Sequence, residues 1–198
     1  YRVRVAATRL LTTFSGDTCD ELLDLAAELK PGKVRSGLLA GLSTCDSVRV
    51  SRGLATLLLD GDHAHRLSML LATQAARGKS KIDNARVRCV REGNLIVSAT
   101  AWRLLVEQEH RLGERLTLDV FERIFDKPAP SAAAELVQGL VMVGDEDFFP
   151  SILRFGAIRG ADVKRAVRKS VVRASKNSAL IEFLIEEGLE SESPGERS

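Results

Sequence analysis

The chain has 198 residues, of which 44% are hydrophobic and 28% are charged. This balance is typical of a folded globular protein and excludes a disordered chain. No apolar run approaches the ~20 residues that a membrane-spanning helix needs, and a formal net charge of +2 is too small to indicate a nucleic-acid partner by itself. Aromatic residues make up only 5%, so we expect a core of leucine, valine, isoleucine and alanine, which favours packed helices over a β-sandwich.

Hydrophobic residues recur every three or four positions along most of the chain, which predicts about eleven helices and no strand. Turn-forming and helix-capping residues separate the first helices at 15–17, 31–32, 46–47, 60–62 and 77–78. A long helix then follows Gly93-Asn94, runs to about Arg111 and is ended by Leu112-Gly113. Later helices are predicted at about 131–143, 146–156, 161–175 and 178–188.

We expect residues 1–188 to form a single helical domain. The segment 127–131 contains two prolines and is the strongest linker candidate, so two halves joined there are the alternative. Residues 189–198 are rich in glutamate and serine and predict a flexible acidic tail. The chain lacks an initiator methionine and opens in what reads as a helix, which indicates a piece of a longer protein.

Three helix starts share a Val-Arg pattern, at 3–7, 34–38 and 48–52, and each leads into closely spaced leucines. Recurring helix starts with small residues indicate stacked helix pairs. The pattern resembles the second helix of HEAT repeats, and the segment 94–105 with its Ala101-Trp102 pair resembles the third helix of armadillo repeats. The resemblance covers roughly residues 1–110 and implies an all-α, irregular α-solenoid of stacked antiparallel helix pairs. An irregular helical domain is the alternative, because Val34 and Val48 are only one helix apart.

Two basic segments are the candidate binding sites. In the first, Arg86, Arg88 and Arg91 are predicted to bind a partner, because few acids nearby can pair with them. The second is the predicted helix 161–175, where basic residues recur at helical spacing. Its candidate residues are Lys164, Arg165, Arg168, Lys169 and Arg173. Pairing of this helix with the acidic segment 177–198 is the structural alternative.

These features predict a non-catalytic interaction or scaffold module that binds an acidic or amphipathic peptide or helix of a protein partner. The alternative is a nucleic-acid-binding helical domain that uses the basic helix 161–175 on the phosphate backbone. A homodimer through the first helix is a further alternative, because its apolar face of Val3, Ala6, Ala7 and Leu10 would lack a neighbour.

No catalytic residue, metal site or cofactor is predicted. His63 and His65 are two positions apart and would diverge on a helix, so Asp62 is interpreted as a helix cap and not as a metal ligand. Trp102 is predicted to lie in the core. The three cysteines, Cys19, Cys45 and Cys89, are odd in number and far apart. They favour buried reduced thiols and an intracellular, cytoplasmic or nuclear, location.

Overall fold

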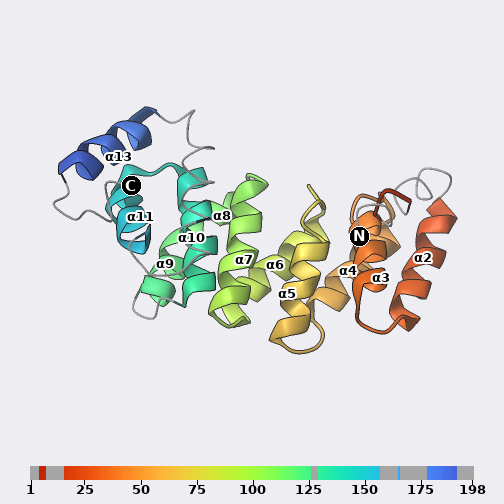
Figure 1. Cartoon of the computed structure of the whole chain (residues 1–198). Coiled ribbons are helices and arrows are strands. Elements are labelled where there is room, and N and C mark those ends of the chain that lie inside the picture. The colour runs from red at the N-terminus through yellow and green to blue at the C-terminus, as the bar shows by residue number, and fades with distance from the viewer. Residues whose placement is uncertain (1–4, 8–15, 126–128, 157–164, 166–177, 191–198) are drawn as a thin grey trace.

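The computed structural model describes residues 5–7, 16–125, 129–156, 165 and 178–190 (Figure 1). Every regular element in these ranges is a helix and none is a strand, so the all-α prediction is confirmed. The main helices are α2 (Gly16–Glu28), α3 (Lys33–Leu42), α4 (Val48–Leu59), α5 (His63–Ala72), α6 (Ser80–Glu92), α7 (Leu95–Glu107), α8 (Arg111–Arg115), α9 (Thr117–Phe125), α10 (Pro130–Val143), α11 (Phe149–Gly156) and α13 (Ser178–Glu190). A 3₁₀ turn, η1 (Glu146–Phe148), precedes α11.

The helices pack along one elongated body, with α2 at one end and α13 at the other (Figure 1). Helices α2, α4 and α6 contact one another in series, as do α3, α5 and α7. Consecutive helices also pack in pairs, α2 on α3, α4 on α5 and α6 on α7. Beyond α7 the order changes, because α10 packs directly against α7 and α9, and α11 then carries α13. Helix α10 begins at Pro130, within the proline segment 127–131, and its main contact is with α7, which precedes that segment.

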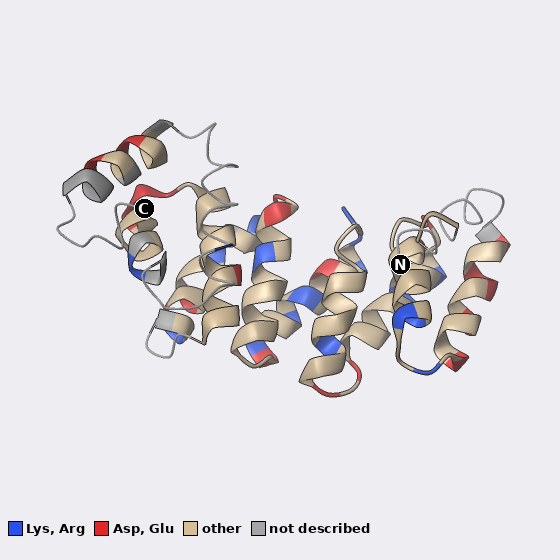
Figure 2. Ribbon diagram, viewed as in Figure 1, with Lys and Arg blue, Asp and Glu red and all other residues tan. Residues whose placement is uncertain are grey.

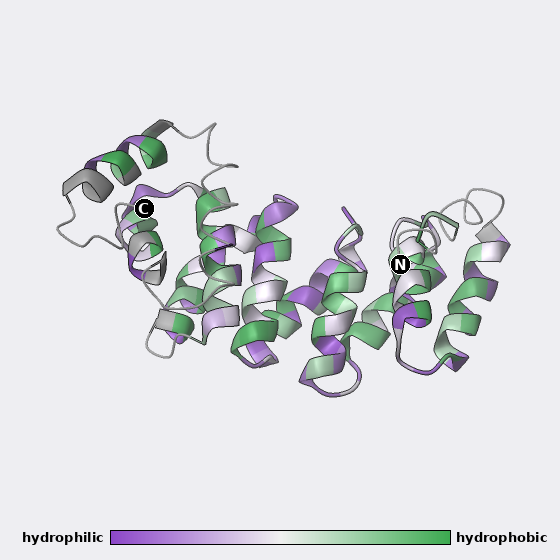
Figure 3. Cartoon of the chain, viewed as in Figure 1, coloured by the Kyte–Doolittle hydropathy of each residue, from purple (hydrophilic) through white to green (hydrophobic). Residues whose placement is uncertain are grey.

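The core is most continuous where α7 and α10 meet. Trp102 on α7 is completely buried, as predicted, and its Nε1 donates a hydrogen bond to the carbonyl of Gly113 at 2.9 Å. Gly139 on α10 lies against the indole ring, where a Cβ atom would come within 2.1 Å of the ring carbon Cζ3. The missing side chain therefore allows α10 to approach α7 closely. Figure 3 shows hydrophobic residues, in green, along both helices.

Local signals set most helix starts correctly. The side chains of Ser47, Asp62 and Asn94 each accept a hydrogen bond from the backbone N–H three residues later, which confirms Asp62 as a helix cap. One predicted boundary is wrong, because α7 ends at Glu107 and not at Arg111. Glu109 has a φ of 55°, which breaks the helix, and α8 then spans the predicted break at 112–113. Helix α13 continues to Glu190 and so includes the first two residues of the predicted tail 189–198, while 191–198 lie outside the described residues.

Cys19 and Cys45 form a disulfide, so the prediction of three free thiols is wrong for two of them. Helix α2 packs against α3 and α4, and this brings Cys19 on α2 beside Cys45 in the α3–α4 connection. The prediction failed because the pairing depends on tertiary packing across 26 residues. Cys89 is free and buried. The intracellular location inferred from reduced thiols thereby loses most of its basis.

No helix in the described ranges combines the length and the apolar character that a membrane crossing requires.

Candidate interaction surface

Arg86 is the first predicted binding residue, and the structure corrects that prediction. Its side chain is completely buried between α5, α6 and α7. Nη1 donates to the Asp83 carboxylate at 2.9 Å, the Ala76 carbonyl at 3.2 Å and the Gln108 side chain at 2.5 Å, while Nη2 donates to the Thr73 carbonyl at 2.6 Å. Burial lowers the pKa of the guanidinium, and the Asp83 carboxylate opposes that shift. Arg86 therefore holds helices together and cannot meet a partner.

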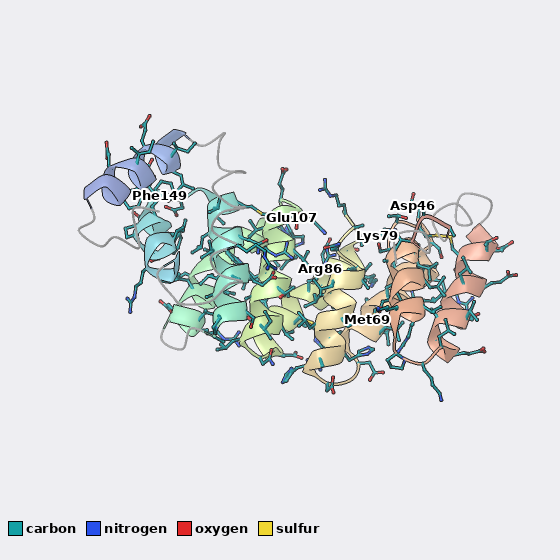
Figure 4. All side chains as sticks on the ribbon, in the orientation of Figure 1. Asp46, Met69, Lys79, Arg86, Glu107 and Phe149 are labelled. Carbon is teal, nitrogen blue, oxygen red and sulfur yellow. A yellow bond between two sulfur atoms is a disulfide. The ribbon has the colours of Figure 1, made fainter. Side chains whose placement is uncertain are left out.

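The burial of Arg86 follows from the face of α6 on which it lies. Ile82, Ala85, Arg86 and Cys89 are all buried and recur at the three- and four-residue spacing of one helix face. That face points into the body, where α7 covers it. The carbonyls of Thr73 and Ala76, just beyond the end of α5, accept hydrogen bonds from Arg86 there. Figure 4 shows Arg86 within the body, on α6, with Glu107 of α7 nearby.

Basic side chains bind the ends of other helices in the same way. A helix end carries unpaired carbonyls and a partial negative charge, so a cation is favourable there. Arg35 donates to Ala26 near the end of α2, Lys79 to Cys45 beyond α3, and Arg123 to Val90 and Gly93 at the end of α6. These cations belong to the fold and not to a binding surface.

Two further arginines join neighbouring helices through ion pairs. Arg49 on α4 lies 2.8 Å from Asp24 on α2 and 3.6 Å from Asp20, and the nearby carboxylates raise its pKa. Arg103 on α7 is almost buried and pairs with Glu107 at 2.7 Å and with Glu135 on α10. These arginines therefore pair with carboxylates of the fold itself.

Two adjacent helices carry a group of exposed basic residues, while others lie singly elsewhere, as Lys33 on α3 and Arg111 on α8 do. Arg52 on α4 and Lys81, Arg88 and Arg91 on α6 are exposed, and we call these four residues the basic ridge. Arg52, Lys81 and Arg91 make no ion pair with any described residue. Arg88 pairs with Glu92 at 3.2 Å, but both side chains are about half exposed, so this bond is weak. Figure 2 shows basic positions on α6 and acidic positions on α2.

The prediction for the first basic segment is therefore right for the exposure of Arg88 and Arg91 and wrong for Arg86. It omitted Arg52 and Lys81, which the helical period could have identified. Arg52 lies opposite the buried stripe of Val50, Leu54 and Leu58 on α4. In the second basic segment, Arg165 is exposed, while Lys164, Arg168, Lys169 and Arg173 lie outside the described residues.

Other polar groups in the body do not converge on a common point. The described ranges contain no group of three or more histidine, cysteine or acidic side chains that could hold a metal ion. His65 places Nε2 3.0 Å from the Leu57 carbonyl at the end of α4, while Asp62 caps α5. Burial raises the pKa of the Cys89 thiol to about 11, so this thiol is unreactive near neutral pH.

Searches of protein-family models, curated proteins and solved structures found no match to this chain.

Proposed function

We propose that this chain is a non-catalytic protein-interaction module in which the basic ridge binds an acidic or amphipathic segment of a partner protein. The observation that carries the proposal is that Arg35, Lys79, Arg86, Arg103 and Arg123 form hydrogen bonds within the fold, whereas the ridge is exposed and three of its four residues make no ion pair with a described residue. The helices that carry these cations are already folded, so binding a ligand would order their side chains but not the backbone.

We further propose that the helices form an irregular, HEAT- or armadillo-like α-solenoid. Two observations support this arrangement. Helices two apart in the chain contact each other in two series, α2–α4–α6 and α3–α5–α7, and consecutive helices pair between the series. Stacks of this kind present long ridged surfaces that bind a peptide or a helix without chemistry.

The spacing of the ridge favours a helical or extended acidic segment. Lys81, Arg88 and Arg91 lie on one stripe of α6, together with the exposed Asn84. A partner helix with acidic residues at three- and four-residue spacing could lie along this stripe and pair with several of them. Exposed ion pairs are individually worth only about 0.2–1 kcal/mol. The ridge would therefore contribute mainly to the rate of association and to the choice of partner.

Fluorescence anisotropy with a labelled amphipathic peptide, carrying glutamate at helical spacing, tests the proposal. The double variant Arg88→Glu/Arg91→Glu is expected to bind the peptide at least about tenfold more weakly than the unmodified chain. The control Lys33→Glu/Arg111→Glu makes the same change in net charge at exposed positions on α3 and α8 and should bind normally. Equal losses in both variants would show that only net charge matters and would refute the ridge as a site.

A labelled DNA duplex in the same assay tests the alternative function. The alternative predicts tight duplex binding that weakens steeply with salt and survives the Arg88→Glu/Arg91→Glu change, because its residues lie in 161–175. Duplex binding of that kind, with no binding of the acidic peptide, would replace the proposed function by nucleic-acid binding.

A further inference from the structure

The outer side of α2 carries an acidic stripe, in which Asp24 pairs with Arg49 on α4 at 2.8 Å and the other acids form no ion pair with a described residue. Asp17, Glu21, Asp24 and Glu28 are exposed and recur at three- and four-residue spacing, so they lie along one side of the helix. Leu25 beside them is 47% exposed. The opposite side of α2 is buried against α3 and α4, its main neighbours.

Helices α2, α4 and α6 begin at the same edge of the molecule. The Ser47 side chain at the start of α4 donates to Asp20 in the first half of α2 at 2.8 Å. Lys79 at the start of α6 lies 3.6 Å from Asp46, next to the start of α4, and also donates to the Cys45 carbonyl. Since the three helices lie in series with α4 in the middle, they run in the same direction and share one outer face.

The two flanking helices of this face carry opposite charge, and α4 between them carries Arg52 and the Asp24-paired Arg49. The acidic stripe of α2 lies on one side of α4 and the basic residues of α6 lie on the other. A two-fold axis along α4 would place α2 of each copy on α6 of its partner, with both helices running in the same direction. The contacts of Ser47 with Asp20 and of Asp46 with Lys79 place Asp20 about level with the start of α6. Glu21, Asp24 and Glu28 would then face Lys81, Asn84 and Arg88, at the same three- and four-residue spacing.

We infer that the outer face of α2, α4 and α6 binds the same face of a second copy of this chain and forms a two-fold symmetric dimer. The inference rests on the proposed function, because the basic ridge is the same surface and α2 of the second copy is its acidic ligand. In a two-fold dimer the same face of both copies meets, so each contact between α2 of one copy and α6 of the other occurs twice. Opposite charges on these two helices therefore favour both contacts.

The size of the face indicates a weak dimer. The three helices have 13, 12 and 13 residues, which corresponds to lengths of about 19 Å. With neighbouring axes about 9 Å apart, the face covers roughly 500–600 Å² on each copy. A total of about 1,100 Å² is at the low end for specific interfaces and is typical of transient ones. The dimer should therefore dissociate on dilution and weaken with salt.

Sedimentation velocity at low salt, over chain concentrations from about 5 to about 200 μM, tests the dimer with two reversed variants. The acid-reversed variant is Glu21→Lys/Glu28→Lys, and the base-reversed variant is Arg88→Glu/Arg91→Glu. We expect the unmodified chain to dimerise with rising concentration, and each variant alone to have a dissociation constant at least about tenfold higher, because like charges then face each other. An equimolar mixture of the two variants should form a heterodimer, since the reversed α2 of one variant then meets the reversed α6 of the other, and the unchanged α6 of the first meets the unchanged α2 of the second.

Three outcomes would overturn the dimer: an unmodified chain that stays monomeric throughout, reversed variants that dimerise as well as the unmodified chain, or a mixture that remains monomeric. The labelled acidic peptide separates this failure from failure of the proposed function. A monomeric chain that binds the peptide through Arg88 and Arg91 refutes the dimer alone. Circular dichroism of both variants shows whether they remain folded, and Lys33→Glu/Arg111→Glu should dimerise normally.

Discussion

Replacement of Arg86 by methionine tests the reassignment of this residue from the surface to the core. The substitution keeps much of the side-chain volume but removes hydrogen bonds to Asp83, Gln108 and the carbonyls of Thr73 and Ala76. Asp83 is only 5% exposed and would keep an unpaired charge in the interior. Removing one partner of a buried ion pair typically costs about 3–5 kcal/mol. We therefore expect Arg86→Met to lower the free energy of unfolding by about that amount.

Urea denaturation followed by the fluorescence of Trp102, the single tryptophan, measures this loss directly because the indole ring is completely buried. Arg88→Met on the same helix is the matched control. Its side chain is exposed, so the free energy of unfolding should change by less than about 0.5 kcal/mol. The double variant Arg86→Met/Asp83→Asn should lose less free energy of unfolding than the two single variants lose in sum. In the double variant no buried charge remains without its partner.

One result would refute this reasoning. If Arg86→Met unfolded at the same urea concentration as the unmodified chain and also bound the acidic peptide more weakly, Arg86 would be an accessible binding residue. The original sequence-based prediction for Arg86 would then be correct, and the burial of this face of α6 against α7 would be wrong.

Two other predictions concern the packing and the thiols. Gly139→Ala should lower the free energy of unfolding by about 1–3 kcal/mol, because its Cβ would overlap the indole ring, whereas Gly53→Ala should cost less because a flexible leucine side chain can move away. With a pKa of about 11, only about one in a thousand Cys89 thiols is ionised at pH 8, so maleimide should react slowly and about tenfold faster at pH 9. In denaturant, mass spectrometry should show one labelled cysteine without reductant and three with it, because Cys19 and Cys45 are joined; three labels without reductant would contradict the disulfide.

The sequence by itself determined where most helices begin and which of their faces are apolar. The caps at Ser47, Asp62 and Asn94 act within three residues, and the hydrophobic period that buries Trp102 repeats within a single helix. Such signals are local, so they can be read before the neighbours of a helix are known. The end of α7 was misplaced because the turn at Glu109 has a conformation that its residue type does not signal.

Only the tertiary structure decided which basic residues are free to bind a partner. Arg86, Arg88 and Arg91 are chemically equivalent and lie on one helix, yet Arg86 meets acceptors that are up to 22 residues away in the chain. The disulfide between Cys19 and Cys45 likewise depends on how α2 packs against α3 and α4. Burial of a helix face depends on the elements that cover it, and a helix end binds whichever cation the packing brings within reach. The charge of a residue is therefore fixed by sequence, while its role in the fold or on the surface depends on non-local contacts.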